Sequence, residues 1–253
     1  MSLAAPPLVS RGGFPKSLHT RKPEGPFIVS SLPGSNQGRL FLNLDRVGMT
    51  GVLLAGGKSR RMGRDKRFLE LDGRTLLERT LSVLESLFAE VIVVVAEPDS
   101  QLAGLRHRIV TDLVPNCATL GGLHAGLTSA AHRRIFAAAC DMPFLSPALI
   151  TWMAELDPDA DVVMAQLASG LQPMHAVYSK ACLPHLERML SIGNLKVQDL
   201  SQAPGLSVRL VAEHELREAD PQFLSFLNIN TAADLEFARK LLAGQRATRG
   251  DEA

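Results

Sequence analysis

Cysteine is scarce in the 253-residue chain, and the few cysteines are scattered. Cys117, Cys140 and Cys182 form no C-x-x-C pair, and an odd, widely spaced set does not make a disulfide framework. Such usage is typical of a reducing compartment. We therefore expect a cytoplasmic protein.

Long apolar runs and an excess of one charge are also lacking. Residues 91–96 form an apolar run far shorter than the roughly 20 residues that a membrane-spanning helix needs. The formal net charge is +1, which gives no support for general binding to nucleic acid. With 46% hydrophobic and 21% charged residues, the composition is that of a globular protein with a sizeable core. We expect neither a membrane nor a nucleic acid as a partner.

Prolines and glycines interrupt residues 1–48, where acids are few and no helical or strand period persists. Such a segment cannot bury enough apolar surface to offset the entropy lost on ordering. We interpret it as a disordered extension or as residues upstream of a natural start at Met49. A targeting peptide is a further alternative, although an apolar core is missing. Residues 49–243 are expected to form a single domain, and residues 244–253 a frayed tail.

The order of strand and helix patterns after Met49 indicates the fold class. β-branched apolar runs predict buried strands, and apolar residues at three- and four-residue spacing predict helices. We expect strands at 51–54, 91–95, 108–110, 135–139, 161–166, 174–178, 208–211 and 223–228, and helices at 75–88, 121–131, 146–156, 180–190 and 231–242. This alternation predicts an α/β fold, a Rossmann-like three-layer α/β/α sandwich with a mostly parallel, doubly wound sheet.

The segment from Val52 to Lys66 places a glycine turn and a cluster of cations after an apolar strand. It contains neither G-x-x-x-x-G-K-[ST] nor G-x-G-x-x-G. The backbone N–H groups of Gly56 and Gly57 can approach a phosphate closely. Arg61 supplies a planar fork and Lys66 a point charge, so we expect both to stabilise charge on a leaving pyrophosphate. The alternative without a ligand is a tight turn followed by a solvent-exposed charged segment.

Acidic residues follow two later strands. Ligands of doubly wound sheets bind outside the carboxyl ends of the strands, where the turn at residues 55–57, Asp112 and Asp141 are expected to meet. Asp141 follows the strand in A-A-C-D-M-P, and its carboxylate can hold a magnesium ion that also binds phosphate oxygens. Asp112 is expected near the base, the ribose or the metal. Helix caps or surface turns are the structural alternatives for both.

Four motifs together resemble those of a known family. L-A-G-G-x-S-x-R-M-G-x-D-K begins at Leu54, and G-G-L-x-A-G-L, C-D-M-P-F-L and N-I-N-T-x-x-D-L follow downstream. They resemble the molybdenum cofactor guanylyltransferases, within the wider nucleotidyltransferases with an α/β nucleotide-binding fold. The resemblance covers residues 50–242. Ala-Gly-Gly in the first motif, rather than Ala-Ala-Gly, favours the guanylyl branch over the cytidylyl branch.

The resemblance implies a reaction and its participants. GMP is transferred from GTP to molybdenum-bearing molybdopterin, which gives the guanine dinucleotide form of the cofactor and releases pyrophosphate, with Mg²⁺ as the metal. Molybdopterin-insertion proteins and molybdoenzyme chaperones are implied as partners. The implied site residues are Arg61, Lys66 and Asp141 for catalysis, with Asp141 on the metal; Leu54, Ala55, Gly56, Gly57, Lys66, Asp112, Gly121, Gly122 and Asp141 for the nucleotide; and Gln172, Pro173, Asn228 and Asn230 for the acceptor.

Two positions leave questions open. Some family members have an asparagine after the second strand, where this chain has Val94-Val95-Ala96; either that nucleotide contact is missing or another group such as Glu97 supplies it. His175, near the acceptor segment, is expected to be a structural histidine with its hydrogen bonds satisfied. Three other functions remain as alternatives: transfer from CTP, transfer to a sugar or alcohol phosphate, and a nucleotide-binding module that delivers the cofactor without turnover.

Overall fold

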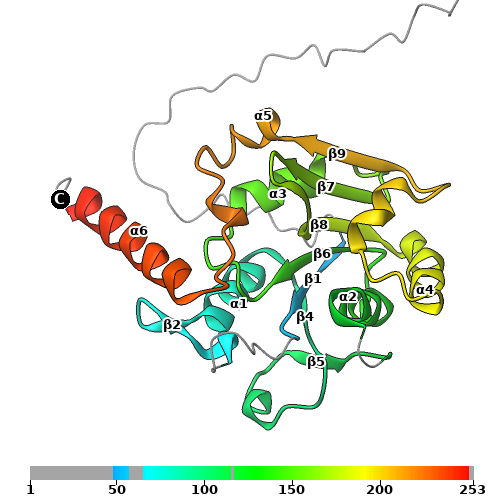
Figure 1. Ribbon diagram of the computed structural model, residues 1–253, viewed down its shortest axis with the longest axis horizontal. Coiled ribbons are helices and arrows are strands. Elements are labelled where there is room, and N and C mark those ends of the chain that lie inside the picture. The colour runs from blue at the N-terminus through cyan, green and yellow to red at the C-terminus, as the bar shows by residue number, and fades with distance from the viewer. Residues whose placement is uncertain (1–47, 57–64, 115–116, 251–253) are drawn as a thin grey trace, which may run out of the picture. The chain divides into compact units, whose positions relative to one another are not determined.

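A computed structural model describes residues 48–56, 65–114 and 117–250, with side chains up to residue 244 (Figure 1). Within these residues, seven strands form one sheet in the order β5-β4-β1-β6-β8-β7-β9. Their bounds are β1 Met49–Leu54, β4 Glu90–Val95, β5 Arg108–Thr111, β6 Arg134–Ala139, β7 Val162–Leu167, β8 Gly170–Ser179 and β9 Val208–Ala212. Strands β5, β4, β1 and β6 are parallel, and β7 pairs parallel with β9. Strand β8 runs antiparallel to both of its neighbours, β6 and β7.

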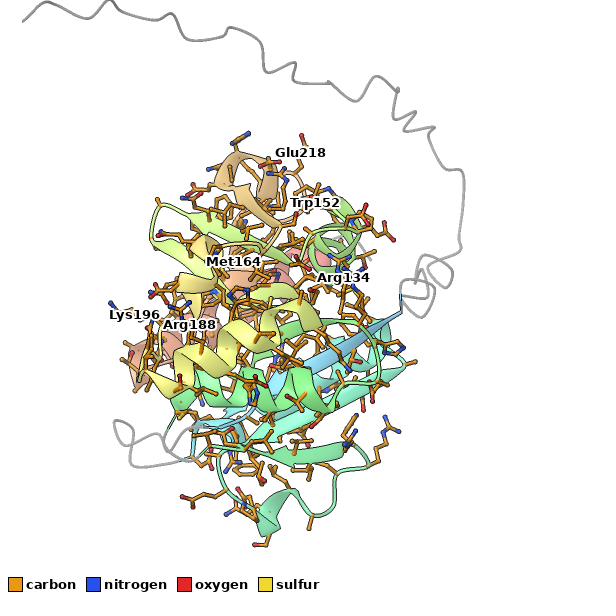
Figure 2. The ribbon with its side chains drawn as sticks, turned by 90° about the vertical axis from the view of Figure 1, so that its right-hand side faces the viewer. Arg134, Trp152, Met164, Arg188, Lys196 and Glu218 are labelled. Atoms are coloured by element: carbon orange, nitrogen blue, oxygen red, sulfur yellow. The ribbon has the colours of Figure 1, made fainter. Side chains whose placement is uncertain are left out.

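Helices cover both faces of the sheet, which confirms the expected three-layer sandwich. Helices α1 and α3 pack on one face, and α2 and α4 lie side by side on the other, the layer that Figure 2 turns toward the viewer. The α-helices are α1 Leu76–Leu87, α2 Ala118–Ser129, α3 Pro147–Leu156, α4 Leu183–Ser191, α5 Glu213–Leu216 and α6 Ala232–Gly250. In the described part of the chain, no helix is both long enough and apolar enough to cross a membrane.

Strand β4 is an example of a central strand that is buried on both sides. Val91, Val93 and Val95 contribute to the core under α1 and α3, whereas Ile92 and Val94 contribute to the core under α2. Both sides of the strand are therefore buried, which requires a continuous apolar run rather than alternation.

The helix starts follow local capping chemistry. Thr75 and Glu78 form a capping box at α1, since each side chain accepts from the other residue's backbone N–H. Ser146 accepts from the Leu149 N–H at the start of α3, with Pro147 as the first helical residue. At the other end of α3, the Arg134 guanidinium (labelled in Figure 2) donates to the carbonyls of Ala154 and Asp157.

A two-residue turn joins the short strands β2 (Glu70–Leu71) and β3 (Arg74–Thr75). Asp72 and Gly73 both have positive φ, 59° and 73°, as a type I′ hairpin requires. Asp-Gly is a dipeptide that such turns prefer. Helix α6 packs beside this hairpin, where Leu235 and Ala238 share a small core with Leu71.

Several expected boundaries are wrong. The segment 223–228 is not a strand, because Phe223 has a φ of 53° and begins a short 3₁₀ turn, Leu224–Phe226. Helix α2 begins at Ala118 instead of Gly121, without a side-chain hydrogen bond from Cys117 to mark its start. Residues 180–182 form a 3₁₀ turn ahead of α4. Helix α6 continues to Gly250, beyond the expected end at Leu242.

Candidate active site

A cavity of about 740 Å³ opens at the carboxyl ends of the parallel strands. Segments far apart in the sequence line it: the ends of β1, β4 and β6, the first turn of α2, the start of β8, and the segment before α6. Of the predicted site residues it brings together Leu54, Gly56, Asp112, Gly122, Asp141, Gln172, Pro173, Asn228 and Asn230. The expected meeting of strand ends at one edge of the sheet is therefore observed.

The end of β1 forms the floor of the cavity. Leu54 lines it together with Val94 of the neighbouring strand. Ala55 donates from its backbone N–H to the Val94 carbonyl at 2.8 Å and is almost fully buried, so its side chain does not line the cavity. A Cβ at Gly56 would lie 3.3 Å from the Ala96 backbone nitrogen, so a larger residue would push the loops after β1 and β4 apart.

Gly121 and Gly122 lie inside the first turns of α2, because the helix begins three residues before the expected start at Gly121. Their lack of a side chain lets the helix approach the strands closely, because a Cβ at Gly122 would lie 2.8 Å from Leu54 Cδ2. A Cβ at Gly121 would lie 3.3 Å from Asp112 Oδ2, and Gly121 itself does not line the cavity. Burial raises the pKa of the Asp112 carboxyl above its usual value.

Lys66, Asp141 and Asn230 converge at one side of the cavity. Lys66 Nζ donates to Asn230 Oδ1 at 2.7 Å and lies 3.8 Å from Asp141 Oδ2. Burial raises the pKa of Asp141, and the nearby Lys66 ammonium opposes that shift. The Ile229 N–H donates to the Asp141 carbonyl at 2.9 Å, which joins the N-I-N-T segment to the end of β6. Residues separated by more than 160 positions thus form one polar cluster.

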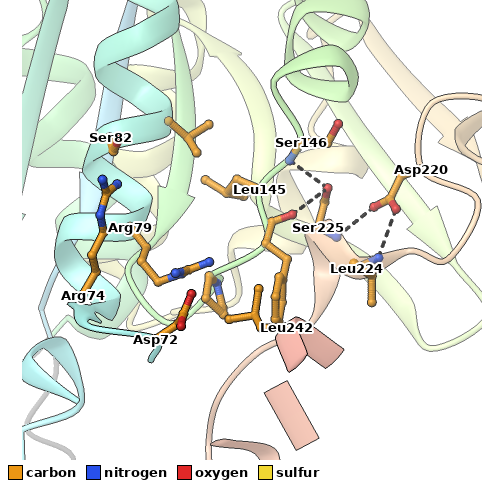
Figure 3. Close-up of a pocket in the computed structure, with 13 residues that line it drawn as sticks. Asp72, Arg74, Arg79, Ser82, Leu145, Ser146, Asp220, Leu224, Ser225 and Leu242 are labelled. Atoms are coloured by element: carbon orange, nitrogen blue, oxygen red, sulfur yellow. Dashed lines mark hydrogen bonds between the residues drawn. The ribbon is translucent and has the colours of Figure 1, made fainter. Parts of the chain in front are cut away.

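The carboxylate of Asp220, which does not line this cavity, anchors the segment that carries Asn228 and Asn230. Asp220 accepts from the N–H groups of Leu224 and Ser225, and Ser225 Oγ accepts from the Ser146 N–H and donates to the Phe144 carbonyl (Figure 3). These bonds tie the segment to the start of α3.

Asp234 fixes the far end of the same segment, because it accepts from the N–H groups of Asn230 and Thr231 at 2.8 and 2.7 Å. Thr231 Oγ1 in return accepts from the Asp234 N–H at 3.2 Å. This exchange caps the start of α6.

An irregularity in β8 presents Gln172 and Pro173 to the cavity. Met164 of β7 pairs with Ala176, but the next residue, Ala165, pairs with Gln172, so residues 173–175 bulge out of the ladder with β7. Proline tolerates this position because it has no N–H to contribute to a ladder. The Pro173 carbonyl accepts from the Tyr178 hydroxyl at 2.8 Å, which fixes the bulge from within.

His175 is buried but not satisfied, which corrects the expectation. Its ring lies between Phe136, edge-on at 5.1 Å between centroids, and Phe226, tilted at 4.7 Å. Neither ring nitrogen has a hydrogen-bond partner within the described residues. Burial lowers the pKa of the imidazole to about 3. Since the side chain is fully covered by core residues, it does not line the cavity.

Two predicted site residues, Gly57 and Arg61, lie outside the described residues. Sequence reasoning assigned no role to other residues that line the cavity: Val94, Ala96, Ala118, Thr119, Ala139, Cys140, Met142 and Met174. The small and apolar ones carry no chemical signal that a sequence pattern could reveal. Glu97, left open as a nucleotide contact, does line the cavity.

A second cavity, of about 790 Å³, lies between α1, the loop after β6 and α6 (Figure 3). Arg79 and Asp72 line it, together with Ser225 and Leu242. None of the predicted site residues borders it. Its size alone therefore does not make it the better candidate for the active site.

The sequence matches known proteins over more than three quarters of its length. A family described as "MobA-like NTP transferase domain" matches residues 51–213. A probable molybdenum cofactor guanylyltransferase of Pelotomaculum thermopropionicum is 39% identical over 200 residues, which cover 79% of this chain and 96% of that protein. A molybdenum cofactor guanylyltransferase of Desulfosudis oleivorans is also 39% identical, over 78% of this chain and 98% of that protein.

The fold has solved counterparts as well. The crystal structure of a molybdopterin-guanine dinucleotide biosynthesis protein A from Archaeoglobus fulgidus superposes with a TM-score of 0.67 at 26% identity. The superposition covers 78% of this chain and all of that one.

Proposed function

The chain belongs to the molybdenum cofactor guanylyltransferases, a family of MobA-like nucleotidyltransferases, and we propose that it transfers GMP from GTP to molybdenum-bearing molybdopterin. The products are the guanine dinucleotide form of the cofactor and pyrophosphate. The observation that carries the proposal is the cluster of Lys66, Asp141 and Asn230 beside the cavity at the carboxyl edge of the sheet.

Lys66 is the residue for the phosphates of GTP. A cation about 4 Å from a phosphate oxygen contributes on the order of 4 kcal/mol at an effective dielectric near 20. The molybdopterin phosphate is already an anion and needs no base, so positioning and charge neutralisation supply most of the rate. Arg61 is proposed to act on the same phosphates, and Gly57 to approach them through its backbone.

Asp141 is the residue for a magnesium ion. Magnesium commonly uses one or two carboxylates and completes its shell with substrate phosphates and water. No group of three or more metal-binding side chains occurs in the described part of the chain, which fits a metal shared with the substrate better than a dedicated protein cage. The carboxylate faces the cavity beside Lys66. When bound, the ion supplies neutralisation of charge on the phosphate oxygens.

The two sides of the cavity divide the substrates. Leu54, Val94 and Gly56 give an apolar floor and close backbone approach for the nucleoside, with Asp112 beside α2 on the same side. Gln172, Pro173, Asn228 and Asn230 border the other side, where we place molybdopterin. The cysteines are scattered and form no disulfide within the described residues, which supports action in a reducing cytoplasm, where molybdopterin-insertion proteins and molybdoenzyme chaperones are the proposed partners.

The test is to incubate the protein with Mg²⁺, molybdenum-loaded molybdopterin and either GTP or CTP, and to measure dinucleotide and pyrophosphate. We expect product with GTP. Product with CTP alone reassigns the chain to cytidylyl transfer, and pyrophosphate release with sugar or alcohol phosphates but not molybdopterin reassigns the acceptor. If the wild type shows no turnover and the Asp141→Ala variant still delivers the cofactor to an apo-enzyme, the protein is a delivery module.

A further inference from the structure

Arg67 bridges the two loops that flank the nucleotide side of the cavity. Its Nε donates to both carboxylate oxygens of Asp65 at 3.0 Å, and its Nη2 contacts the carboxylates of Asp65 and Asp99. Asp65 belongs to the loop that follows β1, whereas Asp99 follows β4. The Arg67 side chain is only 13% exposed. The two carboxylates raise the pKa of Arg67 further above its usual value, with Asp65 as the larger cause.

The bridge joins the two sequence neighbours of Lys66, Asp65 and Arg67. Asp65 Oδ1 also accepts from the Arg67 backbone N–H at 3.0 Å, which caps the 3₁₀ turn Lys66–Phe68. Phe68, the last residue of that turn, packs against the core under α1, and the Arg67 guanidinium lies 5.3 Å from the centre of its ring. The backbone of Lys66 is thus held from both sides, while its side chain extends to Asn230 and Asp141.

Asp99 is itself anchored. It accepts from the Gln101 N–H at 2.9 Å and so caps the 3₁₀ turn Ser100–Leu102, whose Leu102 is buried in the core. The same loop carries Ala96 and Glu97, which line the cavity. A contact between Arg67 and Asp99 therefore fixes the Lys66 turn relative to a wall of the nucleotide side.

We propose that Arg67 is a positioning residue: anchored by Asp99, it holds Lys66 where the ammonium meets the triphosphate. The inference rests on the proposed role of Lys66 in nucleotidyl transfer. Arginine suits the task because its planar fork reaches two carboxylates at once, which a lysine ammonium on a flexible stem does not reproduce. Neither Arg67 nor Asp99 lines the cavity or belongs to the cluster of Lys66, Asp141 and Asn230, so both act through Lys66.

The test is a double-mutant cycle between Asp99→Asn and Lys66→Ala. Asp99→Asn keeps the size of the side chain and removes the charge that Arg67 contacts. We expect kcat to fall by roughly 10- to 100-fold, because a misplacement of about 1 Å can cost about 100-fold. In the Lys66→Ala background the same change is expected to lower kcat less than about twofold, because the group being positioned is gone.

A structural role for Arg67 predicts a different pattern. Loss of folded protein would lower activity by the same factor in the wild type and in Lys66→Ala, so equal factors in the two backgrounds overturn the proposal. An unchanged kcat in folded Asp99→Asn overturns it too. Thermal unfolding followed by circular dichroism checks the fold of each variant. Glu85→Gln is the matched control, since Glu85 pairs with Arg106 and His107 away from the cavity, and it should leave kcat unchanged.

The cycle also separates this inference from the proposed function. The dissociation constant of the magnesium complex of a nucleoside triphosphate is measured for all four proteins, with the triphosphate that binds the wild type most tightly. If the wild type fails to modify molybdopterin, the proposed function fails. A coupling between positions 66 and 99 in the dissociation constant still supports the positioning role of Arg67 in that case. The absence of such a coupling overturns the positioning role.

Discussion

Replacement of His175 by phenylalanine should make the folded protein less sensitive to acid. The imidazole lies between Phe136 and Phe226 with both nitrogens unpartnered in the described structure, and burial lowers its pKa from 6.5 to about 3. Above pH 6.5 the side chain is neutral in both the folded and the unfolded chain. As the pH falls below 6.5 the unfolded chain takes up a proton that the folded chain refuses until about pH 3, so stability is lost across that window.

The magnitude follows from the two pKa values. Each unit between them changes the free energy of unfolding by about 1.4 kcal/mol, and integration from pH 7 to pH 5 gives a loss of about 2 kcal/mol from this one group. His175→Phe keeps the aromatic contacts and removes the titration. The difference in unfolding free energy between variant and wild type should therefore grow in favour of the variant by about 2 kcal/mol as the pH falls from 7 to 5.

Urea denaturation followed by circular dichroism at pH 7, 6 and 5 measures this difference, with equal m-values as the check on two-state unfolding. The size of the difference at pH 7 depends on how the core accepts the larger ring, but its change with pH does not. A difference that stays constant from pH 7 to pH 5 would show that the buried imidazole does titrate in the folded state, and would refute the reasoning. His214→Phe, at an exposed histidine, is the control for removal of a histidine in general.

Three further changes probe the site and its support. Lys66→Ala should abolish most turnover, and a near-normal kcat in a pyrophosphate-release assay would contradict its role. Gly126→Ala should lower the unfolding free energy by roughly 1 kcal/mol in urea denaturation, because overpacking outweighs the gain in helix propensity. The new Cβ would lie 2.6 Å from Val52 Cγ1. Gly104→Ala is the control, since a Cβ at Gly104 would meet open space. Asp220→Ala should lower the unfolding free energy by about 1–3 kcal/mol, because two N–H groups lose their acceptor. It should also raise the KM for molybdopterin more than the KM for GTP. Equal effects on the two KM values would contradict the division of the cavity.

The features that could be predicted from the sequence are those with local causes. The buried strand β4 is a continuous apolar run because both of its sides are covered, and the caps at Thr75 and Ser146 act within three residues. The meeting of Asp112 and Asp141 at one edge follows from parallel strands alone.

The features that escaped prediction have causes distant in the sequence. An apolar segment around Phe223 has the composition of a strand, but the Asp220 carboxylate and the contact of Ser225 with Ser146 hold it as the 3₁₀ turn Leu224–Phe226. Strand β8 is recognisable as a strand, yet its direction and bulge depend on its pairing with β6 and β7. The unpartnered state of His175 is likewise a property of the folded core, which no local pattern encodes.

The reversed direction of β8 also bears on how this enzyme can change over evolutionary time. The parallel strands deliver residues to the cavity from their ends, whereas β8 delivers Gln172 and Pro173 from its beginning, immediately after the tight connection from Leu167 to Gly170. That connection is an exposed hairpin tip, the kind of place that accepts inserted residues without disturbing the sheet. Lengthening it would reshape one wall while the triphosphate side stays intact. On the proposed division of the cavity, insertions there would alter the acceptor side and leave the nucleotide side unchanged.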